Sequence, residues 1–171
     1  DVGDEDVQIA TSSLAVTGNG SIAINRTGRG KLILYVADRL EITGNGRVNS
    51  SGSSSDAVLY YSGSGSVNVG GNAGITGCIF AEKAGVTISG SGSITGHIVT
   101  GGSEVNISGN AKAEAGVIYA PNAGLTLSGS AGIKGGAVVK SLQLTGNTRM
   151  IYDDSAGPEF FEQLDGSATG F

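Results

Sequence analysis

Short runs of alternating aliphatic and polar residues recur along the chain, and each run ends at a glycine. Seven segments align without gaps over nine positions. They are LAVTGNGSI (Leu14–Ile22), LEITGNGRV (Leu40–Val48), VNVGGNAGI (Val67–Ile75), VTISGSGSI (Val86–Ile94), VNISGNAKA (Val105–Ala113), LTLSGSAGI (Leu125–Ile133) and LQLTGNTRM (Leu142–Met150). Positions one, three and nine are apolar in all seven segments, position five is glycine, and position six is Asn or Ser.

This pattern predicts a short strand followed by a tight corner. Alternation at positions one to four is typical of a strand whose positions one and three point inward. The glycine at position five, such as Gly90, suits a backbone with positive φ or a close approach of two chains. An Asn after it, such as Asn19, tolerates the left-handed region and therefore suits a corner. We expect position nine to return an apolar side chain to the interior.

A second apolar segment lies between successive blocks, and its second position is always Ile or Val. The six copies are LILYV (Leu32–Val36), AVLYY (Ala57–Tyr61), CIFAE (Cys78–Glu82), HIVTG (His97–Gly101), VIYAP (Val117–Pro121) and AVVKS (Ala137–Ser141). Each repeat therefore predicts two clear strands and a shorter third strand near position nine.

The repeats start 26, 27, 19, 19, 20 and 17 residues apart, and insertions at Arg26–Lys31 and Ser50–Ser55 explain the two long spacings. A unit of about 19 residues with three strand pieces is typical of one coil of a parallel β-helix. Stacked coils bury apolar columns that a single coil cannot bury. We predict an all-β, single-stranded parallel β-helix (solenoid) of about seven coils, right-handed by the preference of parallel crossovers.

Charge separates a body from two acidic ends in this chain of 171 residues and net charge −5. All ten basic residues lie between Arg26 and Arg149, whereas Asp1–Asp6 holds four acids and Asp153–Asp165 holds five. We predict an acidic N-terminal segment over residues 1–13 that can supply an extra strand, the β-helix over 14–152, and an acidic C-terminal tail with a short helix over 153–171. Because no dense basic patch is present, we expect no nucleic-acid partner.

Several strings carry a family resemblance. GCIFAEKAGVTISGSGSITG, GVIYAPNAGLTLSGSAGIKGGAVVKSLQLTGN and the closing MIYDD resemble the C-terminal β-helix domain of PilX-like pilus-assembly proteins of bacteria. The similar stretch runs from Ala73 to Asp154, about half of the chain. Bactofilins, which polymerise end to end, share the architecture more distantly.

The resemblance implies a structural, non-catalytic protein of the cell surface, a subunit or tip module of an extracellular filament or pilus, and it carries over no catalytic residue. The chain departs from that family because it lacks the N-terminal hydrophobic segment that places such proteins in the membrane or pilus. The sequence starts at Asp1 without an initiator methionine or signal peptide, so we expect a processed or excised form.

The second segment has two apolar columns, which predicts a wall that is covered on both sides. Its second position reads Ile33, Val58, Ile79, Ile98, Ile118 and Val138. Its third position, the candidate docking column, reads Leu34, Leu59, Phe80, Val99, Tyr119 and Val139. The cover is either the chain's own tail, where Gly157–Leu164 reads as a short helix with Phe160, Phe161 and Leu164 on one side, or a partner subunit.

Residues with catalytic or metal-binding chemistry are sparse. His97 and Cys78 share a column on successive repeats, but two ligands without a third do not make a metal site, and plain packing explains them better. The acids of the body stand at different repeat positions and so should not converge as a polysaccharide-cleaving pair does. We therefore expect no catalytic residue, no metal, no cofactor and no enzyme activity.

Other functions remain as alternatives. Polar strand faces could make an adhesin or carbohydrate-binding solenoid, whereas an ice-binding solenoid or a polysaccharide-degrading enzyme is less expected. An ice-binding face needs a regular array of Thr, and the outward column beside the first strand is too mixed: Ala15, Glu41, Asn68, Thr87, Asn106, Thr126 and Gln143. The expected partners are further copies of the chain, in a homo-oligomer or filament, other pilus or surface proteins, or a glycan.

Overall fold

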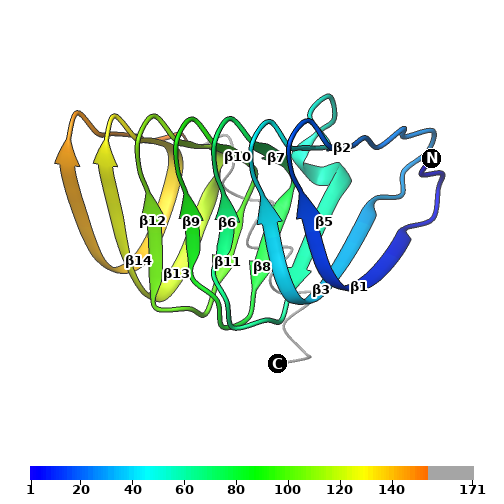
Figure 1. Ribbon diagram of the computed structural model, residues 1–171, viewed down its shortest axis with the longest axis horizontal. Helices are drawn as coiled ribbons and strands as arrows, with labels where there is room; N and C mark the ends of the chain where they lie inside the picture. Colours follow the sequence, from blue (N-terminus) through cyan, green and yellow to red (C-terminus); the bar gives the residue numbers. More distant parts are fainter. Residues whose placement is uncertain (154–171) are drawn as a thin grey trace.

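The computed structural model describes residues 1–153. All strand pairs among these residues are parallel and belong to one sheet of 15 strands (Figure 1). The predicted all-β class with parallel strands is therefore confirmed. The predicted short C-terminal helix, with Phe160, Phe161 and Leu164, lies outside the described residues.

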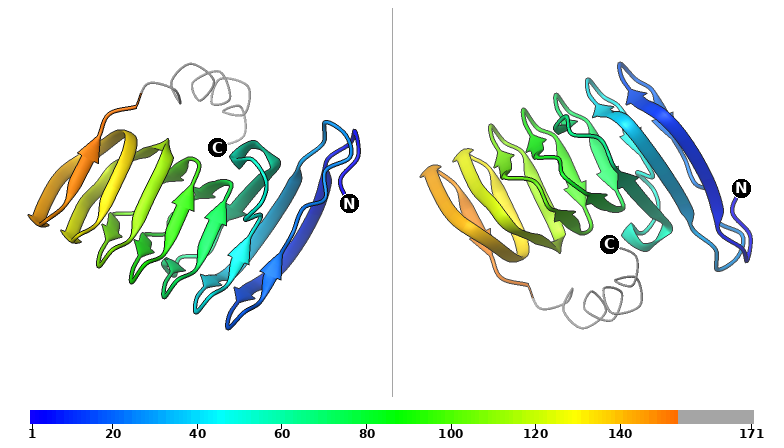
Figure 2. Two further views of the ribbon diagram at one scale, coloured as in Figure 1. Left: turned by 90° about the horizontal axis from the view of Figure 1, so that it is seen from above. Right: turned by 90° about the horizontal axis from the view of Figure 1, so that it is seen from below.

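The strands form three walls that run along the molecule, and each wall takes one strand piece from every repeat (Figures 1 and 2). Within a wall, each strand piece is called a row. The first wall contains the ends of β1 (Val7–Val16) and β3 (Leu32–Ile42), then β6 (Val67–Val69), β9 (Val86–Ile88), β12 (Glu104–Ile107), and the ends of β13 (Lys112–Gly129) and β14 (Gly132–Gly146). The second wall contains the starts of β1 and β3, then β5 (Ala57–Tyr61), β8 (Cys78–Ala81), β11 (Ile98–Thr100), and the middles of β13 and β14. The third wall contains β2 (Ser21–Ile22), β4 (Arg47–Val48), β7 (Gly74–Thr76), β10 (Ser93–Thr95), the starts of β13 and β14, and β15 (Arg149–Ile151).

The register within the first wall follows the spacing of the repeat. The pairs that join successive repeats are Leu14 with Leu40, Ile42 with Val69, Val67 with Val86, Val86 with Val105, Val105 with Leu125, and Leu125 with Leu142. Position nine behaves in the same way in the third wall, where Ile22 pairs with Val48 and Ile133 pairs with Met150. The alignment of the seven segments is therefore confirmed.

The hydrogen-bonded order of strands also closes on itself. Following the pairs leads from β3 through β6, β9 and β12 to β13, and from there through β11, β8 and β5 back to β3. This circuit of eight parallel strands closes because β3 and β13 each continue from one wall into another without a break.

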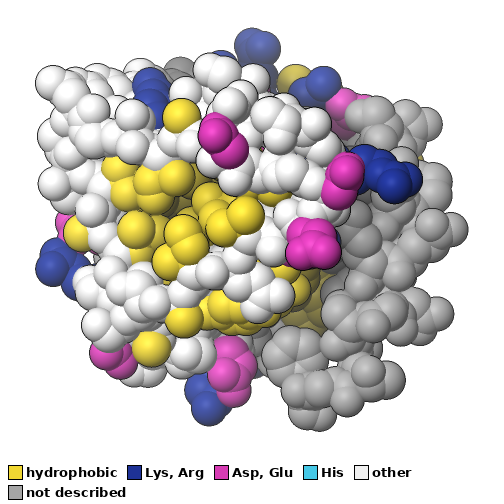
Figure 3. All heavy atoms as spheres, turned by 90° about the vertical axis from the view of Figure 1, so that its right-hand side faces the viewer, with side chains coloured by type: hydrophobic (Ala, Val, Ile, Leu, Met, Phe, Trp, Pro, Cys, Tyr) yellow, Lys and Arg dark blue, Asp and Glu magenta, His cyan; other side chains and the backbone are white. Residues whose placement is uncertain are grey.

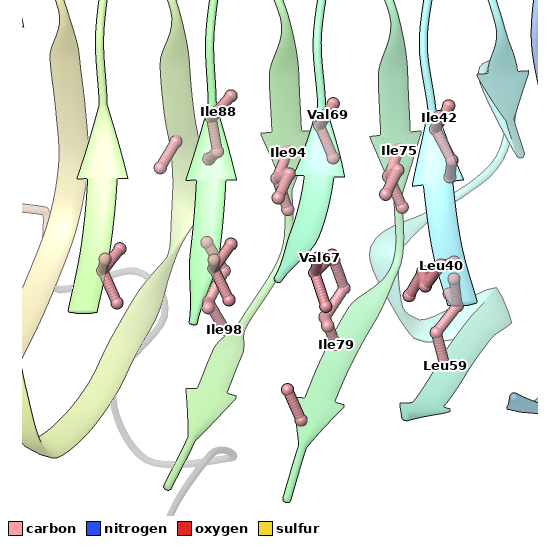
Figure 4. Packing of buried hydrophobic residues seen from close by; sticks show 14 of the residues in the cluster. Leu40, Ile42, Leu59, Val67, Val69, Ile75, Ile79, Ile88, Ile94 and Ile98 are labelled. Atoms are coloured by element: carbon pink, nitrogen blue, oxygen red, sulfur yellow. The ribbon is translucent and has the colours of Figure 1, made fainter. Parts of the chain in front are cut away.

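The core lies between the walls and consists of one apolar column per inward strand position. Side chains from strands on opposite sides point toward one another there, as Figure 4 shows for Leu40, Leu59 and Ile79. Positions one, three and nine are almost fully buried in the middle repeats, where Val86, Ile88 and Ile94 are each 0 % exposed. The inward positions predicted for this part of the repeat are confirmed.

The position-five glycines form a stack at the corner after the first wall. All seven have positive φ, from 60° at Gly18 to 88° at Gly146. The stack is close: a Cβ on Gly90 would lie 2.7 Å from the carbonyl oxygen of Gly71, the stack's previous member. Beside the glycines, the Asn45 amide donates to the Asn19 amide oxygen at 2.9 Å, and Asn72 donates in turn to Asn45 at 3.2 Å.

The two early insertions contact each other. Asp56, at the end of the 3-10 helix η1 (Ser54–Asp56), is 6 % exposed and accepts a hydrogen bond from the Ser53 N–H at 2.7 Å. Its other carboxylate oxygen pairs with the Arg26 guanidinium of the first insertion. The insertions therefore lengthen their repeats without interrupting the walls.

The register of the second wall differs from the sequence prediction in three strands. Leu34 and Leu59 are 4 % and 0 % exposed, in line with Ile79 in the core, and Val139 is partly buried against that core. The strands of the middle repeats are shifted by one residue relative to the predicted alignment, because Val58 pairs with Cys78 and Ala137 pairs with Ile118. Placing Leu34, Leu59 and Val139 on the outer face was therefore wrong.

Candidate interaction surfaces

The outer face of the second wall carries one continuous column of large side chains. Its members, in register from the N-terminal end, are Ala10, Tyr35, Tyr60, Phe80, Val99, Tyr119 and Val138. Phe80, Val99 and Tyr119 lie where the sequence predicted them, whereas Tyr35, Tyr60 and Val138 replace the three residues that point inward. An alignment based on apolar residues did not identify these three as outward-facing, because the residue on each side of them is apolar or aromatic too.

Three rings of this column stack face to face. The centroids of Tyr35 and Tyr60 lie 5.3 Å apart at 13°, and those of Tyr60 and Phe80 lie 5.2 Å apart at 25°. Burial, followed by the neighbouring Tyr35, raises the pKa of the Tyr60 hydroxyl. Because Tyr35 and Phe80 lie on its two faces, the middle ring, Tyr60, presents mainly its edge to the surroundings.

A groove of about 850 Å³ runs along this column from Ala10 to Pro121. One side is formed by the residues that follow the column toward the first wall, including Val36, Ala81 and Thr100. The Tyr61 hydroxyl, which also lines the groove, donates to the Asp38 carbonyl oxygen at 2.9 Å. The groove is therefore long and mostly apolar, and it follows the direction in which the repeats stack.

The N-terminal end of the molecule leaves inward columns uncovered. β1 pairs with β3 on one edge and with no other described strand. Val7 and Ile9, which pair with the buried Leu32 and Leu34, are 36 % and 47 % exposed. Figure 3 views this end directly: hydrophobic side chains gather near its middle, and charged side chains lie toward the margin.

The C-terminal end of the described chain also exposes inward positions, here those of the first and third walls. Leu142, Leu144 and Met150 are 48 %, 49 % and 38 % exposed. Their partners one repeat earlier, Leu125 and Leu127 among them, are nearly completely buried. The loss of burial in the final repeat thus follows from the absence of a further repeat among the described residues.

The glycine and asparagine series also stop at these two ends. Within the stack, each main-chain N–H after the glycine donates to the glycine carbonyl of the preceding repeat, from Asn45 with Gly18 to Asn147 with Gly129, each at 2.7 Å. No described repeat follows Gly146, and none precedes Gly18. A Cβ on Gly18 would have no atom within 4 Å, in contrast to the next six glycines of the stack.

His97 and Cys78 occupy adjacent rows of the second wall. His97 Nδ1 accepts a hydrogen bond from the Val117 N–H at 3.0 Å, and burial lowers the pKa of the imidazole. Burial raises the pKa of the Cys78 thiol, whose Sγ lies 3.8 Å from the Ser54 carbonyl oxygen. Within residues 1–153, no group of three or more His, Cys, Asp or Glu residues could hold a metal ion.

The six acids of the body are distributed over different elements. Four of them contact a basic residue: Glu41 pairs with Arg39, Asp56 with Arg26, Glu82 with Lys83, and Glu114 with Lys112. Asp38 lies in β3 and Glu104 in β12. These acids therefore lie on separate elements, and most of them pair with a basic residue close to them.

Comparison with known proteins places the chain in a family. A domain of unknown function (DUF7305) matches residues 1–114, two thirds of the chain, and matches again over residues 99–157. The chain belongs to this family. No curated protein and no solved structure matches it. In the part that the structure describes, no helix is long and apolar enough to span a membrane.

Proposed function

We propose that this DUF7305 chain is a structural, non-catalytic module that assembles end to end into a filament. The observation that carries the proposal is that inward positions of the walls lie uncovered at both ends of the described chain. The inward columns run from one end to the other in one register, and each end leaves large apolar side chains exposed: Val7 and Ile9 of the second wall at one end, Leu142 and Leu144 of the first wall at the other. Unpaired strand edges with exposed apolar side chains favour the addition of another strand.

The proposal treats the three walls as the faces of a parallel β-helix of seven coils. It is supported by the pairing of each repeat with the next repeat in all three walls. Seven coils at a strand spacing of about 4.8 Å give a module roughly 34 Å long. Right-handed winding, expected from the preference of parallel crossovers, is part of this proposal.

Head-to-tail stacking would continue every column across the junction. Leu142 of one copy would take the place that precedes Leu14 of the next copy, and Leu144 the place that precedes Val16. Gly146 would lie against Gly18, and the Gly146 carbonyl would accept from the Asn19 N–H as the glycine carbonyls inside the molecule do. The Asn19 amide could also donate to Asn147, which extends the ladder seen at Asn45.

The setting we propose is an extracellular filament or pilus, in which the chain is a subunit or tip module at the cell surface. Its partners would be further copies of itself and other pilus or surface proteins. The support for this setting is the resemblance of Ala73–Asp154 to the β-helix domain of PilX-like proteins. A role in stacking and lateral contact needs no catalytic group, in keeping with the scattered carboxylates.

The test is the mass of the native protein as a function of concentration, measured by light scattering, with two substitutions at the junction. Gly18→Ala adds a methyl group that meets nothing in the isolated chain, but in a stack it would meet Gly146 at the 2.6 to 3.0 Å seen for the other glycines. Leu144→Lys places a charge in the junction. We expect growth with concentration in the native chain and in the control Gln143→Lys, whose side chain points outward. Equal assembly of Leu144→Lys and Gln143→Lys, or a native chain that stays monomeric, would contradict the proposal.

A further inference from the structure

We infer that the groove along the second wall is the docking site of the chain's own C-terminal segment, residues 154–171. The groove lies on the side of the molecule, whereas the stacking columns lie at its ends, so docking in the groove and end-to-end stacking use different surfaces.

The groove is suited to apolar side chains, because its lining is mostly apolar and aromatic. Aromatic side chains contribute large apolar contact areas and prefer offset-stacked or edge-to-face neighbours. Here Tyr60 is covered on both faces, by Tyr35 and Phe80 at centroid distances of 5.3 and 5.2 Å. What remains open is a long, mostly apolar channel whose lining includes Phe80, Val99 and Tyr119. A segment of chain with a few large apolar side chains matches such a channel.

The described chain ends where it would enter this wall. β15 pairs with the start of β14, so that Ile151 lies beside Lys134. Three residues after Lys134, Ala137 begins the second-wall portion of β14. If the chain continued as β14 does, three further residues after Ile151 would bring it to the edge of the second wall, beside the strand that holds Val138.

The length of the remaining segment matches the distance to be covered. The row of Phe80 lies four rows, roughly 19 Å, from the row that residue 154 would enter. Seven residues in extended form span up to roughly 24 Å. The segment has 18 residues, so Phe160 and Phe161 can reach the groove whether the chain before them is extended or partly coiled.

The segment carries large apolar side chains that can fill the groove. The chain has four phenylalanines: one is Phe80 in the groove, and the other three are Phe160, Phe161 and Phe171. The other large apolar residue of the segment is Leu164. The acids between them can remain in water at the open side of the groove.

Tryptophan fluorescence tests the docking, because the chain contains no tryptophan of its own. The probe is Phe161→Trp in the full chain, and its reference is a synthetic peptide of residues 154–171 with the same substitution. We expect the full chain to emit at shorter wavelength than the peptide and to resist quenching by iodide. Val99→Asp or Phe80→Ser in the groove should remove both effects, whereas Thr126→Asp on the outer face of the first wall should leave them unchanged.

Several results would overturn the inference. Emission and quenching equal to those of the peptide would show an undocked segment, and this reading does not depend on whether any groove variant folds. Protection that persists in both Val99→Asp and Phe80→Ser would place the segment elsewhere. Protection that disappears on dilution would assign the groove to the segment of a second copy. Repeating the measurement with Leu144→Lys separates docking from end-to-end assembly, since we expect docking to survive that substitution.

Discussion

The glycine stack makes a quantitative prediction about stability. Gly18 and Gly90 occupy the same position of the repeat and have similar backbones, with φ of 60° and 69°. They differ in their surroundings: a Cβ on Gly90 would lie 2.7 Å from the Gly71 carbonyl oxygen, whereas a Cβ on Gly18 would have open space. Alanine at these two positions therefore separates the cost of the backbone conformation from the cost of stacking.

The magnitudes follow from these two terms. A left-handed backbone costs a non-glycine residue about 1–2 kcal/mol, and the loss of glycine's freedom in the unfolded chain offsets about 0.4–1 kcal/mol of this. Gly18→Ala should thus lower the free energy of unfolding by about 1 kcal/mol. Gly90→Ala adds overpacking against main-chain atoms, which costs about 1–3 kcal/mol, so the total should be about 2–4 kcal/mol.

Urea denaturation of both variants provides the measurement, with the midpoint and the m-value compared with those of the unsubstituted chain. The comparison should be made at a concentration where the protein is monomeric, because stacking would add a second effect at Gly18. If the two variants lose the same stability, the close approach of the glycines is not what limits this position, and the reasoning from the stack is refuted.

Three further predictions concern burial and charge. Burial lowers the pKa of His97, so the unfolded chain binds the proton more readily than the folded chain does. The free energy of unfolding should therefore be highest above the ordinary histidine pKa of about 6.5 and should decline as the pH falls below that value. His97→Val should flatten the pH dependence of the urea midpoint, and an unchanged slope would contradict this origin. Asp56→Ala removes the partner of Arg26 and the capping carboxylate of η1, and it should lower the free energy of unfolding by about 2 kcal/mol in the same assay. A decrease of less than about 0.5 kcal/mol would argue against a stabilising role for this carboxylate. Leu127→Ala should lower the free energy of unfolding by about 3 kcal/mol because the Leu127 side chain is 0 % exposed. Leu144 is 49 % exposed, so Leu144→Ala should lower it by only about 1 kcal/mol in the monomer. Thermal unfolding that ranks the two variants in the reverse order would contradict the position of Leu144 at an uncovered end.

The sequence predicted the first and third walls well because the glycine marks a fixed point in every repeat. Counting from that residue placed Val86 and Ile88 inward and Thr87 outward, and the strand pairs agree with this count. The physical cause is the steric demand of the stack, which tolerates only glycine and so leaves a visible signature.

The second wall has no such marker, and there the prediction failed by one residue. In Leu32–Val36 every residue is apolar or aromatic, so alternation could not tell Leu34 from Tyr35. The connection before each second-wall strand also varies in length, so the position of that strand cannot be found by counting residues from the glycine. The pairing of Arg26 with Asp56 could not be predicted either, because it joins two insertions that lie far apart in the sequence and that the repeat pattern does not describe.

The most direct test of end-to-end assembly is the helical rise in a cryo-electron micrograph reconstruction of filaments grown from the full chain. The proposal predicts a polar filament in which subunits repeat about every 34 Å and the strand spacing of about 4.8 Å continues without interruption across each junction. Filaments built by side-to-side contact, or by two C-terminal ends facing each other about a twofold axis, would contradict it.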